Sequence, residues 1–174
     1  MAFVAYMTIT GAVQKDLHPT ASTNKSIGQV STGNADYADK ITVLGFSSSI
    51  VIPRDMVTGV STSSQVLEPV TFSKYFDKAS PLLWQALATN ELLTEIACEF
   101  WRPNYEGKGA PEKFFTIKWT TCTLIGGKAY TPLIIDPANG FFQYMDEWSF
   151  TYKAVAYDHL ISSTSGSVDP SKSA

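Results

Sequence analysis

The stretch PVTFSKYFDKASPLLWQALATN, residues 69–90, predicts a strand, a turn and one short helix. The helix is expected to begin at Ser80 and Pro81, because a serine hydroxyl can accept from the free amides of the first turn and proline there forfeits no hydrogen bond. Thr89 and Asn90 should end it, since asparagine tolerates a left-handed C-terminal cap. Between these limits, an apolar stripe at helical spacing comprises Leu82, Leu83, Ala86 and Leu87.

Just before the predicted helix, Lys74 and Lys78 flank Asp77. Such an arrangement is more often a solvated turn than a site, and we expect a solvated turn here.

Outward from this stretch, two-residue alternation predicts strands over residues 3–10, 41–52, 92–102, 114–125 and 147–157. A turn is expected at Gly126 and Gly127. These features predict a mainly β, antiparallel two-sheet barrel or sandwich with one short α-helix at about residues 80–90. We expect one domain over residues 1–161, followed by a small, polar and therefore flexible tail over residues 162–174.

The composition restricts the possible partners. Thirteen basic and 16 acidic residues give a net charge of −3, which argues against binding a nucleic-acid backbone. Only 17% of the residues are charged, against about 25% in an average domain.

Several predicted strands are apolar on one face and rich in Ser and Thr on the other. Such a face suits packing beside a neighbour or a polar channel, although ordinary exposed strands remain an equal alternative.

The chain offers few groups for chemistry. Glu95 and Glu99 share a strand face but lie ~13 Å apart, and the adjacent Asp146 and Glu147 face opposite ways. No nucleophile elbow or phosphate-binding loop is present in the sequence. We therefore expect no catalytic site and no cofactor.

Two cysteines and two histidines remain. Cys98 and Cys122 fall within predicted strands and are expected to be free and buried, with a disulfide as the open alternative. His18 and His159 lie at opposite ends of the chain, so no metal site is expected.

No apolar run approaches the ~20 residues of a membrane-spanning helix. Residues 2–7 are apolar, but no basic residue precedes them and no clean cleavage site follows. We interpret them as a strand and expect neither membrane insertion nor a cleaved signal peptide.

Three blocks in the same order resemble the haemolysin-coregulated protein family of type VI secretion. The first is K-x-x-D-x-x-S-P, present as Lys74, Asp77, Ser80 and Pro81; the others are FFTIKWTTCTLI and DEWSFTYKAVAY. The resemblance covers residues 46–157. It implies a structural subunit that forms homohexameric rings, which stack into the inner tube and are exported from the cytoplasm. It also implies type VI sheath, spike and effector proteins as partners.

In the resembled family, the position of residues 54–68 holds an extended loop that meets the next ring. This chain carries Gln65 and Leu67 where many members have basic and histidine residues. The candidates for ring stacking are Arg54, Asp55, Thr58, Gly59, Ser63 and Gln65. The candidates for a face lining the lumen are Ser47 and Ser49.

The alternative function is a monomeric β-sandwich that binds a ligand such as a carbohydrate. It would require exposed tryptophans, for which Trp101 and Trp148 are the candidates, although both are more typical of a core.

Overall fold

The computed structural model describes residues 5–28, 37–104, 107, 109–133, 135–140 and 143–172. The first strands are β1 (Ala5–Gly11), β2 (Lys15–Asp16), β3 (Ile41–Val43), β4 (Gly45–Ser47), β5 (Ile50–Val51) and β6 (Val66–Leu67). They are followed by β7 (Val70–Tyr75), β8 (Leu92–Arg102), β9 (Glu112–Tyr130), β10 (Met145–Thr151), β11 (Ala154–His159) and β12 (Thr164–Val168). The helices are α1 (Asn24–Ile27) and α2 (Ser80–Ala88), with 3₁₀ turns η2 (Pro137–Asn139) and η3 (Pro170–Lys172). Residues 3 and 4 of the first predicted strand lie outside the described residues.

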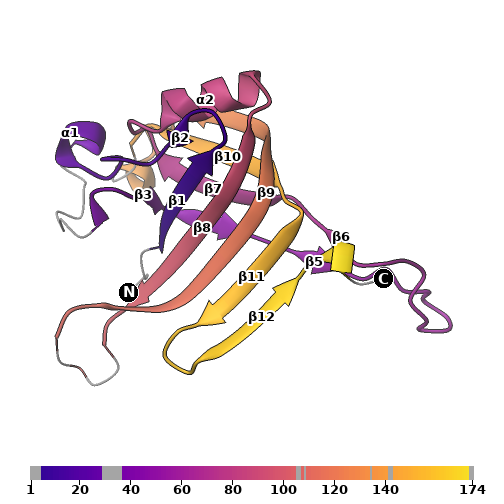
Figure 1. Cartoon of the computed structure of the whole chain (residues 1–174). Helices are drawn as coiled ribbons and strands as arrows, with labels where there is room; N and C mark the ends of the chain where they lie inside the picture. Colours follow the sequence, from indigo (N-terminus) through magenta and orange to yellow (C-terminus); the bar gives the residue numbers. More distant parts are fainter. Residues whose placement is uncertain are drawn as a thin grey trace.

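The main sheet closes on itself. Its hydrogen-bonded order is β2-β1-β8-β9-β10-β7-β4, every pairing is antiparallel, and β3 pairs with β1. Only Leu44 separates β3 from β4, and its amide donates to the Ser73 carbonyl at 2.8 Å. The short segment β3–β4 therefore joins the two ends of the sheet into a barrel (Figure 1). The predicted antiparallel two-sheet fold is confirmed, and the second sheet is the two-stranded pair β5–β6.

Large side chains fill the barrel. The most deeply buried include Met7, Ile9, Phe72, Trp119 and Phe150. Trp119 and Phe72 each meet Phe150 edge-on, with ring centroids 5.4 Å and 6.2 Å apart. Helix α2 buries Leu83 and Ala86 and lies beside the upper ends of β8 and β9 in Figure 1. This apolar interior is the main favourable contribution to folding.

A buried ionic network lies where β7, α2 and β10 meet. The Lys74 ammonium donates to Asp77 Oδ1 at 2.7 Å, to Ser80 Oγ at 2.8 Å and to the Tyr75 carbonyl at 3.1 Å. The Ser80 hydroxyl donates in turn to Asp146 Oδ2 at 2.6 Å. Asp146 Oδ2 also lies 3.3 Å from the ammonium. All three protons of Lys74 and the single proton of Ser80 are thus used within this network.

The expected solvated turn at Lys74 and Asp77 is wrong, because both side chains are withdrawn from solvent. The expected role of Ser80 also differs. Asp77 Oδ1 accepts from the amides of Ala79 and Ser80, while Ser80 Oγ accepts from the Asp77 amide. This is the reciprocal pattern of a capping box, so Asp77 rather than Ser80 caps the first turn.

A second buried carboxylate ties the end of α2 to the turn after β1. Glu91 Oε1 accepts from the amides of Val13 and Gln14 at 2.8 Å each, and Oε2 accepts from Gln14 Nε2 at 2.9 Å. A Cβ on Gly11 would lie 2.3 Å from Glu91 Oε1, so the close approach requires glycine. Burial alone would raise the pKa of Glu91, but the hydrogen bonds from Gln14 and Val13 lower it.

Two predicted strands are interrupted. The 41–52 stretch divides into β3, β4 and β5, and the 147–157 stretch divides at Tyr152 and Lys153. The second division occurs because β10 pairs with the C-terminal half of β9, whereas β11 pairs with its N-terminal half.

The turn expected at Gly126 and Gly127 is wrong, because β9 continues through both residues. The ring of Trp148 lies over Gly127, where a Cβ would approach it to 2.6 Å. Gly127 therefore makes room for a neighbouring ring rather than for a turn.

The flexible tail expected from residue 162 contains a strand instead. β12 pairs with β11 from Thr164 opposite His159 to Val168 opposite Val155. Backbone hydrogen bonds order this segment, although nearly all of its side chains are exposed. Residues 173 and 174 lie outside the described part of the chain.

Burial raises the pKa of the Asp146 carboxyl, although the Lys74 ammonium and the Ser80 hydroxyl act in the opposite direction. A carboxyl with a raised pKa in the folded state favours folding most at a pH below its unfolded pKa. That contribution is lost as pH rises through the folded pKa. Asp146→Asn cannot titrate. We therefore expect the stability of this variant, relative to the unsubstituted protein, to improve from about pH 4 to about pH 7.

Urea unfolding midpoints across this pH range would measure the effect. Asp16→Asn, at an exposed aspartate, controls for the loss of one carboxyl group. A difference between Asp146→Asn and the unsubstituted protein that stays constant with pH would contradict the prediction.

Candidate assembly surfaces

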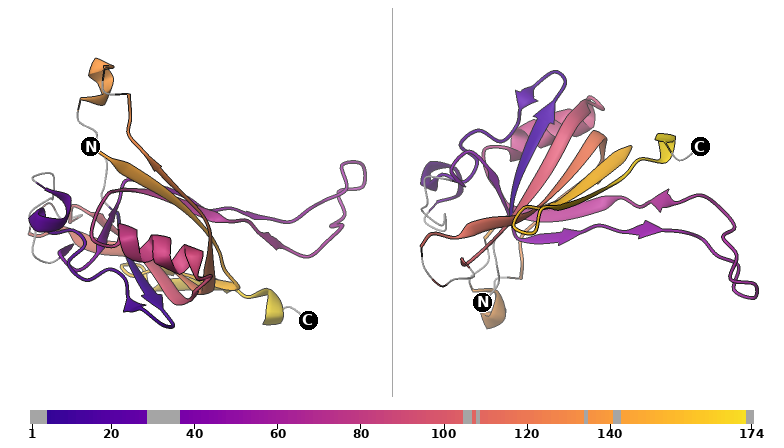
Figure 2. Two further views of the ribbon diagram at one scale, coloured as in Figure 1. Left: turned by 90° about the horizontal axis from the view of Figure 1, so that it is seen from above. Right: turned by 60° about the horizontal axis from the view of Figure 1, so that its bottom comes forward.

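Residues 50–67 form a long hairpin that projects away from the barrel (Figures 1 and 2). We call it the arm. Ile50 pairs with Leu67 and Val51 with Val66 at its base, and Arg54 bridges Ser61 further out. The sequence predicts a strand as far as residue 52, which includes β5, but only a long connection without apolar periodicity over residues 54–68, so the partner strand β6 was missed.

The turn at the end of the arm is held by Asp55. Its Oδ1 accepts from the Thr58 amide at 2.7 Å, from the Thr58 hydroxyl at 2.9 Å and from the Val57 amide at 2.9 Å. These hydrogen bonds, led by that from the Thr58 amide, lower the pKa of Asp55. Gly59 adopts a left-handed φ of +69°, and its carbonyl accepts from Arg54 Nη1 at 3.2 Å. Four of the six stacking candidates therefore build the turn itself.

The residues that the arm presents are apolar. Met56 is 100% exposed, Val57 is 93% exposed and Val60 is 63% exposed. We call Met56, Val57 and Val60 the arm tip. Sequence reasoning missed them, although an apolar pair between the turn-forming Asp55 and Gly59 was a usable signal. Of the other candidates, Ser63 is exposed and Gln65 is partly exposed.

A face of small hydroxyl groups covers the outside of three adjacent strands, β4, β7 and β10. The register places Ser47 opposite Thr71, and Thr71 opposite Ser149. Beside this row, Ser73 pairs with both Gly45 and Glu147. We call Ser47, Thr71, Ser73 and Ser149 the hydroxyl face. The two lumen candidates, Ser47 and Ser49, are both exposed, and Ser49 lies two residues beyond Ser47, after the end of β4.

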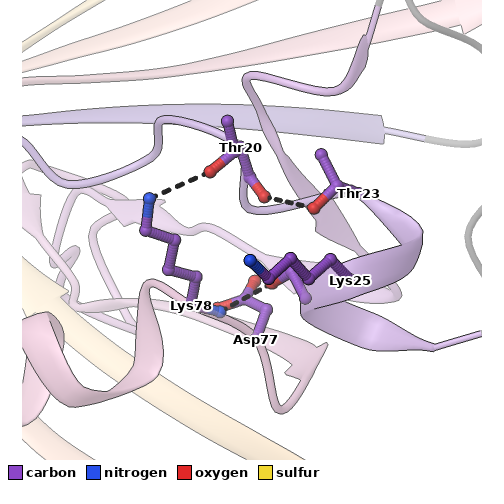
Figure 3. A pocket seen from close by; sticks show the side chains of 6 residues that line it. Thr20, Thr23, Lys25, Asp77 and Lys78 are labelled. Atoms are coloured by element: carbon purple, nitrogen blue, oxygen red, sulfur yellow. Dashed lines mark hydrogen bonds between the residues drawn. The ribbon is translucent and has the colours of Figure 1, made fainter.

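A surface hollow of about 660 Å³ lies beside the buried network (Figure 3). The Lys78 ammonium donates to Thr20 Oγ1 at 3.0 Å, and the Lys78 amide donates to Ser26 Oγ at 2.8 Å. Within the described residues, no group of three or more His, Cys, Asp or Glu side chains could hold a metal ion. The polar groups of the hollow thus connect the α1 region to the start of α2.

The other candidate groups have structural partners. Glu99 forms ion pairs with Lys40 and Lys113. His18 Nδ1 contacts the backbone of Ile9, and His159 Nδ1 accepts from the Ser162 amide. Cys98 and Cys122 are free and buried, and burial raises the pKa of each thiol to about 12.

The tryptophans do not form an exposed binding platform. Trp148 is completely buried. The ring of Trp101 meets Tyr37 edge-on at 4.9 Å and has the Lys40 ammonium 5.6 Å from its centroid. Neither of the two tryptophans that the sugar-binding alternative names, Trp101 and Trp148, is therefore an exposed ring. In the described part of the chain, no helix is both long and apolar enough to cross a membrane.

Comparisons with known proteins agree with this geometry. The family model for "Type VI secretion system effector, Hcp" matches residues 6–159. The "Major exported protein" of Pseudomonas aeruginosa is 36% identical over 169 residues, which cover 97% of this chain and 96% of that protein.

Two solved structures are also similar. One, described as an Hcp protein, superposes with a TM-score of 0.89 at 27% identity and covers 97% of this chain and 98% of its own. The secreted protein Hcp3 from Pseudomonas aeruginosa superposes with a TM-score of 0.79 at 32% identity and covers the same shares. This chain therefore belongs to the haemolysin-coregulated protein (Hcp) family of type VI secretion.

Proposed function

We propose that this protein is the structural subunit of a type VI secretion inner tube. Six copies form a ring, the rings stack into a tube, and the tube is exported. The name of the Pseudomonas aeruginosa relative, "Major exported protein", supports export. Sheath and spike proteins are the expected partners of the tube, and effectors are its expected cargo.

The arm carries the proposal. Apolar side chains as exposed as Met56 and Val57 are costly on a free monomer unless another surface covers them. The hydrogen bonds of Asp55 hold the turn so that these side chains point outward from a defined structure. The arm is thus a preorganised contact element, which reduces the entropy lost on association.

The hydroxyl face supports a lumen-lining role for the sheet β4-β7-β10-β9. The side chains of the hydroxyl face are too polar to belong to a hydrophobic core, and they are uncharged. A channel lined in this way neither attracts apolar cargo strongly nor repels cargo of either charge. We propose that Ser47 and Ser49 face the lumen.

Deleting Thr58 to Gln65 should leave rings intact but impair their stacking. The deletion removes Ser61 and the turn, while both residue pairs at the base of the arm remain. The pelleted fraction in ultracentrifugation and negative-stain images would measure stacking, and ring mass would confirm assembly.

A milder variant, Met56→Ser with Val57→Ser, should also reduce stacking while leaving rings intact. Its control is Val13→Ser, at an exposed valine outside the arm. Normal tubes and normal secretion of the deletion variant would overturn the stacking role.

Labelling a cysteine at position 47 tests the lumen assignment. In Ser47→Cys, a small maleimide should react in both rings and tubes. A maleimide attached to a bulky polymer should react in rings and much more slowly in tubes. In a tube, the neighbouring rings cover the two ends at which the lumen of a single ring is open. The native thiols should stay unlabelled since both are buried. Equal reaction of the bulky reagent with rings and tubes would place Ser47 outside the lumen.

A further inference from the structure

The surface hollow beside the buried network is lined mainly by side chains that can donate hydrogen bonds. Its volume is about 660 Å³, within the ~300–1,000 Å³ typical of small-molecule sites. We call its lining residues the lysine hollow; they are Thr20, Thr23, Lys25, Ser26, Asp77 and Lys78 (Figure 3). Helix α1, which contributes Lys25, lies on the side of the barrel away from the arm (Figure 2). The lysine hollow is therefore separate from the arm tip.

Neither lysine of the hollow has an acidic partner in the part of the chain that the structure describes. The ion pairs there involve other cations, namely Lys40, Lys74, Arg102 and Lys113. The Lys78 ammonium instead donates to the neutral hydroxyl of Thr20 at 3.0 Å. The positive charges of Lys25 and Lys78 are thus unmatched by any carboxylate within ion-pair distance among the described residues.

Two hydroxyl groups of the hollow keep a proton that they can donate. Thr20 Oγ1 accepts from the Lys78 ammonium, and Ser26 Oγ accepts from the Lys78 amide at 2.8 Å. A hydroxyl has one proton beside its two acceptor positions, so each of these groups can accept and still donate. The Thr23 hydroxyl, in contrast, donates to the Thr20 carbonyl at 2.9 Å. The lysine hollow therefore offers two ammonium groups and two hydroxyl protons to a ligand.

The single acidic side chain among the six, Asp77, already has a buried cation as its partner. Asp77 is 8% exposed, and its Oδ1 accepts from the Lys74 ammonium at 2.7 Å and from the amides of Ala79 and Ser80. Asp39 accepts from the Thr20 amide but does not line the hollow. The lining residues consequently carry an excess of positive charge, although the net charge of the whole chain is −3.

The backbone at Thr20 is held in a conformation that is unfavourable for a β-branched residue. Its φ is +59°, in the left-handed region. Contacts of its amide with Asp39, of its carbonyl with Thr23 and of its hydroxyl with Lys78 keep it there. Strained residues of this kind concentrate at ligand-binding sites, where they fix groups before the ligand arrives. The position of the Thr20 hydroxyl is thus set in advance, which reduces the entropy lost on binding.

We propose that the lysine hollow binds the phosphate group of a small phosphate monoester, such as a nucleotide. Lys25 and Lys78 pair with its charge, and the hydroxyls of Thr20 and Ser26 donate to its oxygens. A phosphate monoester presents three terminal oxygens to these four donor groups, whereas a carboxylate presents only two. The bound ligand ties the α1 segment to the turn before α2. This binding goes beyond the proposed tube function and does not depend on it.

Titration calorimetry of the full-length protein with AMP, at constant ionic strength, tests the site. We expect saturable binding that is weakened at least about tenfold in Lys25→Met and in Lys78→Met, because each loses one charge-assisted contact. Lys118→Met, at an exposed lysine of β9, is the matched control and should bind AMP as the unsubstituted protein does. Lys78→Met also removes the contact with Thr20, so Lys25→Met is the decisive variant.

Inorganic phosphate as a second titrant identifies which part of AMP is recognised. Equal affinities for the two would show that the phosphate group alone is bound, and tighter binding of AMP would show that the nucleoside also contributes; either result supports the site. Absence of saturable binding of both, or equal affinity of Lys25→Met and Lys118→Met, would overturn it. As an independent measurement, AMP should protect Lys25 and Lys78 from acetylation, read by mass spectrometry, and should leave Lys118 reactive. Equal protection of all three lysines would show unspecific binding of the anion and would likewise overturn the site.

Discussion

The hydrogen bonds of the Lys74 ammonium hold together the parts of the molecule on which assembly depends. A buried cation is costly unless it is paired, and here Asp77, Ser80 and Asp146 surround it. These residues belong to the turn before α2, to α2 itself and to β10. The network thus fixes the helix, the central strands and the end of β7 relative to one another. Loss of one partner from a buried ion pair typically costs ~3–5 kcal/mol of folding stability. Few substitutions within this network would therefore keep its geometry.

One sheet serves two purposes because of this arrangement. Its inner side is buried among aromatic rings, and its outer side carries hydroxyl groups that no apolar neighbour would favour. The arm that projects from this sheet carries the apolar arm tip. A subunit with a polar face and an apolar arm is suited to the stacking that we propose. In a ring of six copies, as proposed, such contacts would be individually small and strong only when all of them act together.

The sequence predicts the fold well where local signals dominate. Strand β8 occupies residues 92–102 as predicted, and α2 begins at Ser80, because alternation and the Ser-Pro start are local features. Strands β6 and β12 were missed, since their order comes from backbone pairing between residues that carry no apolar pattern. The burial of Lys74 was missed because Asp146, its distant partner, is 72 residues away. The sequence indicated the turn residues of the arm but not Met56 and Val57, although both lie between the turn-forming Asp55 and Gly59.

The solution mass of the purified protein, measured by light scattering on a sizing column, tests the ring most directly. The account predicts a species near six times the 19.0 kDa chain, with larger species in multiples of that mass. A strict monomer at high protein concentration would contradict it. In that case, the exposed arm tip would require a different partner.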